Sequence, residues 1–568
     1  MNSCSLLLPR LSGLLRSAAV LLTVAPLTAW AGGNASEPIA NLWLAGRDHI
    51  ARESADRAVA TDPSPRHRAW QAFLDQRAGA AVDLFMQAAP SPRSAADAAT
   101  LAQMQLAARR PADAAATLES ALPASGAAAL QLALARCEVL RARRQITEAA
   151  GLAEQTLSTL PEGSPQALVA ALRNQSGLAR LALRQPEPVR TAIGGLRHSA
   201  PGFPRAGAWA DLLEAALRRD TDPAAALDLY ARADHLAAEL GDRITRLRAL
   251  QGIGMTAQAA GRLAAGVEAA RQSVTVAESL REPVQAAYAA NNHGYGLFEI
   301  GRPAEGLRLI EEARERFTKL DHQLGMTFTR TGAAILLRHL GRLTEAERLS
   351  REALELARRL DHRHSIIEAL DNLALARQRQ GFGREARAIL TAARQLEPDG
   401  TSRDALWIEL NLARLDYAQG RLEGLDGRLA PLAAGFGKLN LHSEEALALA
   451  YDLRAHVRSC RPAEAAAIAE RLESLRADRL NAEAIHHRAL ALAVHHDRPD
   501  TIRALAETAE ADGFAELALE ARLVAAILAG DAPAMQTAGL LAAEQGFREL
   551  HIWAEAVRRI PPTTPTAE

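Results

Sequence analysis

Apolar side chains recur along this chain with the period of an α-helix, and a glycine interrupts them at a regular interval. After Gly341, the residues Leu349, Ala353, Leu356 and Leu360 fall on one helical face, with charged residues on the other faces. A second helical pattern precedes this glycine. Because glycine accepts a left-handed backbone without steric cost, the pattern predicts two helices joined by a tight turn at Gly341.

The same unit recurs through the middle of the chain, with turn positions at Gly261, Gly301, Gly341, Gly381, Gly420 and Cys460. The successive spacings are 40, 40, 40, 39 and 40 residues. Weaker copies of the junction occur near Arg77, Arg110, Gln145, Gln185, Asp220, Asp497 and Gly530. No stretch is rich in strand formers, so the fold class is predicted to be all-α. About a dozen helical hairpins should stack to bury their apolar faces.

These repeats resemble the tetratricopeptide repeat (TPR) in its longer, 40-residue bacterial form. The Asn-Leu-Gly signature of that family falls on Asn292-His293-Gly294, Asn372-Leu373-Ala374 and Asn411-Leu412-Ala413. Its small residue early in the second helix falls on Gly266, Gly306, Ala346, Ala386 and Ala465. His293 and Leu425 depart from the pattern. The resemblance covers most of residues 41–560 and is strongest over 220–398. It implies a right-handed superhelical solenoid that binds a protein or peptide partner.

The resemblance also implies a concave groove lined by the first helix of each hairpin. Carried over by register, the candidate peptide-groove residues are Tyr288, Asn291, Asn292, Tyr295, Phe298, Arg338, Asp371, Asn372, Arg379, Trp407, Asn411, Arg414 and Tyr417. Asparagine amides can bind the backbone of an extended peptide, and aromatic side chains supply desolvated anchors. The alternative is that these residues pack between adjacent first helices and face water.

The composition and the motifs of the chain limit the kinds of binding and catalysis that it can perform. The chain has 66 Lys and Arg against 67 Asp and Glu, a formal net charge of −1, which gives no electrostatic case for nucleic-acid binding. We find no catalytic or nucleotide-binding motif, so no enzyme activity and no cofactor are predicted. The pairs His486-His487 and His495-His496 lack the spacing of a metal site, and we expect them to be solvated surface residues.

The amino-terminal sequence has the features of an export signal. Arg10 and Arg16 precede an apolar run, and Ala29-Trp30-Ala31 supplies the small residues that a signal peptidase requires. We therefore predict a cleaved signal peptide at residues 1–31 and a periplasmic or secreted mature chain without a membrane span. The repeats are predicted to divide into irregular copies at 32–200, a regular array at 201–475 and divergent copies at 476–560, followed by a tail at 561–568. The segment His198–Trp209, with two prolines and two glycines, is the expected joint.

Three functional hypotheses follow. The leading one is an exported, non-enzymatic scaffold for protein–protein contacts, with the assembly of an envelope or secretion complex as its setting. The alternative is a sensory or regulatory ligand-binding module that acts through a membrane signalling partner. An enzyme with a dispersed active site in the irregular amino-terminal repeats is the weakest of the three, because no nucleophile–base or metal constellation is present.

Overall fold

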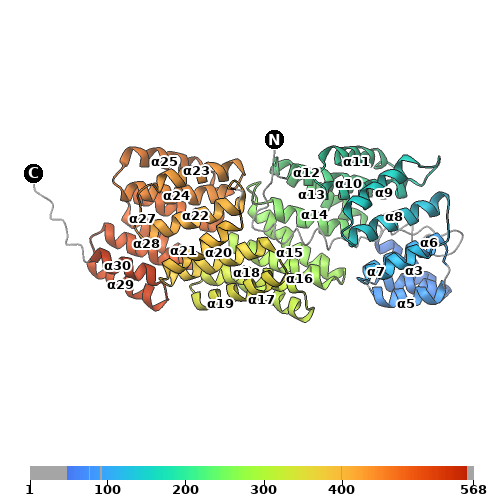
Figure 1. Cartoon of the computed structure of the whole chain (residues 1–568), viewed down its shortest axis with the longest axis horizontal. Coiled ribbons are helices and arrows are strands. Elements are labelled where there is room, and N and C mark those ends of the chain that lie inside the picture. Colours follow the sequence, from blue (N-terminus) through green and yellow to red (C-terminus); the bar gives the residue numbers. More distant parts are fainter. Residues whose placement is uncertain (1–47, 76, 90–92, 220, 398–399, 559–568) are drawn as a thin grey trace, which may run out of the picture. The chain divides into compact units, whose positions relative to one another are not determined.

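The computed structural model describes residues 48–75, 77–89, 93–219, 221–397 and 400–558. These ranges form 28 α-helices, α3 to α30, and a short 3-10 turn at Ala477–Arg479, with no β-strand (Figure 1). The all-α prediction is therefore confirmed. No helix in these ranges is both long enough and apolar enough to cross a membrane. The predicted export signal (1–31) and the predicted tail (561–568) lie outside the described residues.

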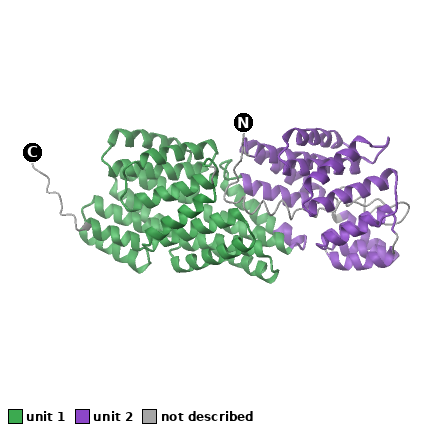
Figure 2. Ribbon diagram, viewed as in Figure 1, with its two compact units in different colours: residues 1–13, 257–274, 283–568 green, residues 14–256, 275–282 purple. Residues whose placement is uncertain are grey.

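The helices fall into two compact units, shown in different colours in Figure 2. Among the described residues, unit 2 comprises 48–256 and 275–282, and unit 1 comprises 257–274 and 283–558. The helices of unit 2 are α3 (Asp48–Thr61), α4 (Pro65–Leu74), α5 (Ala78–Ala88), α6 (Ala95–Ala107), α7 (Pro111–Glu119), α8 (Gly126–Ala142), α9 (Ile146–Ser158), α10 (Gln166–Ala182), α11 (Pro186–Ser199), α12 (Arg205–Arg218), α13 (Pro223–Leu240) and α14 (Arg243–Thr256). Helix α15 (Leu263–Ser279) contributes to both units.

The helices of unit 1 continue the same alternation. They are α16 (Pro283–Glu299), α17 (Pro303–Lys319), α18 (Gln323–His339), α19 (Leu343–Arg359), α20 (Arg363–Arg379), α21 (Gly383–Gln395), α22 (Arg403–Ala418), α23 (Asp426–Lys438), α24 (His442–Arg458), α25 (Pro462–Ser474), α26 (Ala482–His495), α27 (Pro499–Ala511), α28 (Ala515–Leu528), α29 (Ala532–Glu544) and α30 (Arg548–Arg558). Each helix packs on the next one, so α16 pairs with α17, α18 with α19 and α20 with α21.

A residue with a left-handed backbone ends the first helix of these hairpins. Gly301, Gly341 and Gly381 have φ values of 82°, 77° and 87°. This conformation is strained for residues that carry a Cβ atom, which explains the regular glycine. Cys460 takes the place of glycine in its hairpin and still adopts a φ of 52°. The turn function assigned to the recurring glycine from sequence is therefore present in the structure.

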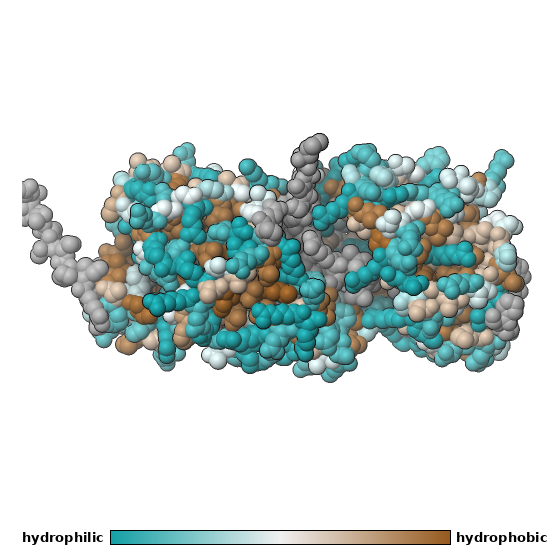
Figure 3. Space-filling view, in the orientation of Figure 1, coloured by the Kyte–Doolittle hydropathy of each residue, from teal (hydrophilic) through white to brown (hydrophobic). Residues whose placement is uncertain are grey.

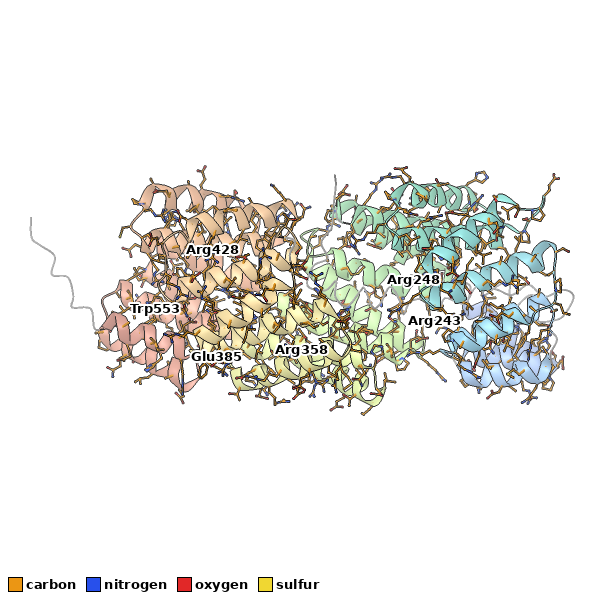
Figure 4. All side chains as sticks on the ribbon, viewed as in Figure 1. Arg243, Arg248, Arg358, Glu385, Arg428 and Trp553 are labelled. Atoms are coloured by element: carbon orange, nitrogen blue, oxygen red, sulfur yellow. The ribbon has the colours of Figure 1, made fainter. Side chains whose placement is uncertain are left out.

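From α16 to α25, the first helix of each hairpin buries more of its residues than the second helix does. Helices α17, α19, α23 and α25 run along the margins of unit 1, and α18, α20, α22 and α24 lie between them (Figure 1). The outer helix α19 buries Leu349 and Leu356 and exposes Arg358, which is labelled in Figure 4. Along such exposed faces, opposite charges pair locally, as Arg342 does with Glu345. Hydrophilic residues accordingly cover much of the face in Figure 3, with smaller hydrophobic areas between them.

The joint expected at His198–Trp209 does not coincide with the division between the units. Helices α11 and α12 pack on each other across this segment, and both belong to unit 2. The buried rings of Phe203 and Trp209 meet edge to face, with centroids 5.8 Å apart. The exposed residues Pro201, Gly202 and Pro204 therefore form a surface turn from which Phe203 packs into the core of unit 2. The boundaries at residues 200 and 475, which were predicted to separate the regular repeats from the irregular and divergent ones, remain predictions.

Candidate functional site

The predicted groove residues lie on α16, α18, α20 and α22, the inner helices of unit 1. All of them except Asn292 have exposed fractions of 8% or less. Their side chains therefore face a filled interior, which corrects the picture of an open groove and also the alternative that they face water. Their role in binding stays a prediction.

The interior is filled because the last inner helices pack against the earlier ones. Helix α26 contacts α16, and α30 contacts both α20 and α28. Phe514, at the start of α28, lies against the rings of Phe298 and His339, with centroids 6.0 and 5.4 Å apart. Inner faces that are far apart in the sequence thus share one core within unit 1.

Opposite charges meet across this interior. Helices α18 to α24 contribute arginines, and α26 to α30 contribute glutamates. Arg379 pairs with Glu516, and Arg454 pairs with Glu520. A guanidinium nitrogen of Arg414 lies 3.7 Å from a carboxylate oxygen of Glu483. Buried charges are costly unless they are paired, so the late glutamates allow the early arginines to be buried.

Burial shifts the pKa values of several groups in this interior. The pKa of Arg338 falls to about 9, chiefly because the guanidinium is desolvated and also because Arg379 is near. Desolvation also lowers the pKa of His487, and the nearby guanidinium of Arg414 adds to the effect. The Arg454 guanidinium keeps its charge, since Glu520 opposes the effect of burial and raises its pKa. The interior is therefore a polar core in which Glu483 and Glu516 only partly offset the effect of burial on Arg338.

A cavity of about 50 Å³ lies in this interior and is lined in part by Trp553 of α30. Figure 4 labels Trp553. We call it the Trp553 cavity. Its charged lining residues are Arg379, Arg414, Arg458, Glu516, Glu520 and Glu549. Its aromatic lining residues are Tyr417, Tyr451 and Trp553. Trp553 is partly exposed, whereas Tyr417 and Tyr451 are buried, so the cavity runs from the surface toward the core. Its volume suffices for several waters or for the end of one side chain.

A second, smaller cavity of about 10 Å³ lies near Trp407. Its lining includes Tyr295, Phe298, Arg403 and Glu444. The indole N–H of Trp407 donates to a carboxylate oxygen of Asp371 at 2.9 Å, and Arg403 pairs with Glu444 at 3.2 Å. This cavity holds no more than one water, so the Trp553 cavity is the better candidate for a ligand group.

Unit 2 has a polar interior of its own, built between neighbouring hairpins. Arg205 donates two hydrogen bonds to Asp242, at 2.7 and 2.9 Å, and both side chains are almost fully buried. Glu138 accepts from Gln103 at 3.0 Å, and burial raises the pKa of this carboxyl well above its usual value.

The histidine pair at the start of the divergent repeats lies elsewhere than expected. His486 and His487 have exposed fractions of 4% and 6%, so they are buried rather than solvated. His486 lies 2.9 Å from a carboxylate oxygen of Asp512, and the ring of His487 lies against Tyr451. In the part of the chain that the structure describes, no group of three metal-ligating side chains converges.

Comparison with known families identifies the repeat. Residues 285–359, which include most of α16 and all of α17, α18 and α19, match the family model of the tetratricopeptide repeat. Residues 285–359 therefore consist of tetratricopeptide repeats. None of the curated protein sequences matches it.

Several solved structures resemble parts of this chain at low sequence identity. The apo form of RapI has 11% identity and a TM-score of 0.44, and the likeness covers 59% of this chain and 99% of that one. Aspartyl phosphate phosphatase F from Bacillus subtilis has 11% identity and a TM-score of 0.42, over 63% and 96% of the two chains. The APC/C hetero-tetramer Cut9-Hcn1 has 14% identity and a TM-score of 0.40, over 93% and 94%. These are likenesses of fold alone.

The TPR register found part of the Trp553 cavity and missed the rest. Arg379, Arg414 and Tyr417 belong to the predicted set, whereas Tyr451, Arg458, Glu516, Glu520, Glu549 and Trp553 do not. Tyr451 and Arg458 could have been found by extending the register through the Cys460 hairpin. The glutamates lie beyond Cys460, where the spacing of the turns becomes irregular. The one sequence feature that could have indicated them is their negative charge, which is opposite to that of the earlier arginines.

Proposed function

We propose that this TPR protein is a non-enzymatic scaffold that binds a protein or peptide partner, and that unit 1 receives part of the partner in the Trp553 cavity. One observation carries the proposal. The inner wall of unit 1 is filled by the chain's own helices, and the Trp553 cavity joins that wall to a partly exposed aromatic side chain. Aromatic and arginine side chains in such positions dominate the energetics of many interfaces.

We also propose that the protein is exported and works in an envelope or secretion complex. The support is the amino-terminal sequence, with its basic start, apolar run and Ala29-Trp30-Ala31 site. The intact mass of protein from native cells tests this. A chain that begins at Gly32 is expected, and a cytosolic chain that retains Met1 would contradict export.

Crosslinking tests the binding site. A photo-crosslinking residue replaces Ile552, which is 60% exposed and adjacent to Trp553, so it should capture a partner segment at the mouth of the cavity. Trp553→Ala and Arg458→Met, each introduced separately, should lower the yield of the same crosslinked product at least tenfold. Arg358→Ala on the outer helix α19 should leave that yield unchanged. Thermal unfolding of each variant checks that the fold is retained.

An equal yield from Trp553→Ala, Arg458→Met and the parent protein would contradict binding at the cavity. A loss with Arg358→Ala alone would place the partner on the outer helices instead.

A further inference from the structure

Two hydrogen-bond acceptors in the wall of the Trp553 cavity lack a positively charged donor. Gln378 lines the cavity with an exposed fraction of 7%, and its side-chain oxygen has no hydrogen-bond partner. Its amide nitrogen donates to Glu549 at 3.2 Å. Glu549 itself has no lysine, arginine or histidine nitrogen within ion-pair distance among the described residues. A buried acceptor left without a donor costs free energy, so this wall favours a ligand that brings N–H groups.

The arginines of the cavity are already engaged elsewhere. Arg379 pairs with Glu516. The Arg414 guanidinium lies toward Glu483 and over the ring of Tyr451. Arg458 donates to the backbone oxygen of Tyr417 at 3.2 Å and lies over the rings of Tyr417 and Trp553. Reorienting any of them toward Glu549 would break these contacts, so a positive group that pairs with the Glu549 carboxylate would come from outside the chain.

We propose that the Trp553 cavity binds a positively charged nitrogen group, an ammonium or guanidinium, with the Glu549 carboxylate as its counter-ion and the Gln378 oxygen as a second acceptor. The hydrocarbon stem of the ligand would lie against Leu550 and Trp553. This inference rests on the proposed function, since it names the chemistry of the partner group that enters the cavity. A lysine or arginine side chain of a peptide and a small free amine both carry that chemistry.

Binding should be linked to the protonation of Glu549. Burial, together with the charges of Glu516 and Glu520, raises the pKa of Glu549 to about 8, and Arg379 only partly opposes the shift. At neutral pH the side chain is therefore mostly a neutral carboxylic acid. A cationic ligand would pair with the carboxylate, so the O–H bond of Glu549 breaks and its proton passes to solvent. Affinity should rise as the pH approaches 8 and level off above it.

Calorimetric titration tests the proposal with defined probes. The probes are acetyl-Gly-Lys-Gly-amide, the same peptide with norleucine in place of lysine, and n-butylamine. At pH 7, in two buffers of different ionisation enthalpy, the lysine peptide should release roughly nine-tenths of a proton per molecule bound. The norleucine peptide should bind at least tenfold more weakly. Equal affinity for n-butylamine would identify a free amine as a sufficient ligand, and tighter binding of the peptide would identify a peptide side chain.

Glu549→Gln is the decisive variant, because glutamine resembles the protonated acid and should leave the fold intact at pH 7. It should weaken binding of the lysine peptide at least tenfold and abolish proton release. The matched control, Glu544→Gln, changes an exposed glutamate at the end of α29 and should leave both unchanged.

Equal binding of the lysine and norleucine peptides, no binding of either cation, or unchanged binding by Glu549→Gln would each overturn the cationic ligand. In those cases, loss of the partner crosslink with Trp553→Ala would still support the proposed function. If Trp553→Ala also leaves the yield of the crosslink unchanged, both the cationic ligand and the proposed function are contradicted.

Discussion

Units 1 and 2 bury charged groups in different ways. In unit 2 the buried pair Arg205–Asp242 joins residues 37 positions apart, so it links neighbouring hairpins. In unit 1 the pair Arg379–Glu516 joins residues 137 positions apart, across the interior. The stability of a repeat array is approximately a sum over nearest neighbours, and the Arg205–Asp242 pair is a contact of that kind. The long-range ion pair of unit 2, Arg109–Glu282, lies at its surface. The contacts of unit 1 add a term between distant repeats, so its early and late hairpins should lose stability together.

The largest effect should come from breaking the neighbour pair of unit 2. Asp242→Ala removes the buried carboxylate that accepts two hydrogen bonds from Arg205, and it also removes a cap on the backbone N–H of Thr245. We expect a loss of about 3–5 kcal/mol in the stability of that region. Hydrogen exchange should show reduced protection in α12 to α14 and little change in unit 1. Loss of protection throughout both units would contradict nearest-neighbour behaviour.

Breaking the long-range pair of unit 1 should cost less but reach further. Glu516→Ala leaves Arg379 unpaired, yet the Glu516 side chain is 28% exposed, so water can replace part of the lost interaction. We expect about 1–3 kcal/mol. Protection should fall in α20 and α28 together, although they are far apart in the sequence. Reduced protection in α28 alone would show that the two helices are not energetically coupled.

A turn substitution should sharpen the same comparison. Gly341→Val forces a β-branched residue into a backbone with φ of 77° and places its Cβ atom 3.4 Å from that of Ala515. The strain should cost on the order of 1–2 kcal/mol. In a purely local array only α18, α19 and their neighbours would respond. Because Ala515 and Phe547 contact this turn, we expect reduced protection in α28 and α30 as well.

The smallest effect should be a pH dependence of hydrogen-exchange protection, and it should be confined to α30. The pKa of Glu549 rises from its ordinary 4.5 to about 8, so the folded state favours the protonated form. Its contribution is fully present below about pH 4.5, and it is lost as the pH rises to about 8. Hydrogen exchange within α30, corrected for intrinsic rates, should therefore show falling protection across that window. The pH dependence should disappear in Glu549→Gln, and its persistence there would assign it to another group.

The sequence allowed the hairpins and their turns to be predicted because both depend on local rules. The period of 40 residues placed the turn glycines, and helical periodicity placed residues such as Asn411 on inner helices. The closing of unit 1 could not be predicted in this way. It depends on the accumulated rotation between successive hairpins, which no single repeat encodes. Register therefore placed Arg379 on the inner face but could not show that Glu516 lies opposite.

The central claim is that the early and late inner helices of unit 1 share one interior, and an engineered disulfide tests it most directly. A Cβ atom at Gly301 would lie 3.5 Å from that of Ala482, within the range that disulfides span. A cysteine can adopt the left-handed backbone of such a turn, as Cys460 does. Gly301→Cys with Ala482→Cys, in a background with Cys4, Cys137 and Cys460 all replaced by Ser, should form the bond on mild oxidation, detected as a loss of two hydrogens by mass spectrometry. Gly301→Cys with Ala543→Cys, an exposed site on α29, should stay reduced under the same conditions. Two free thiols in the first pair would contradict the closed interior.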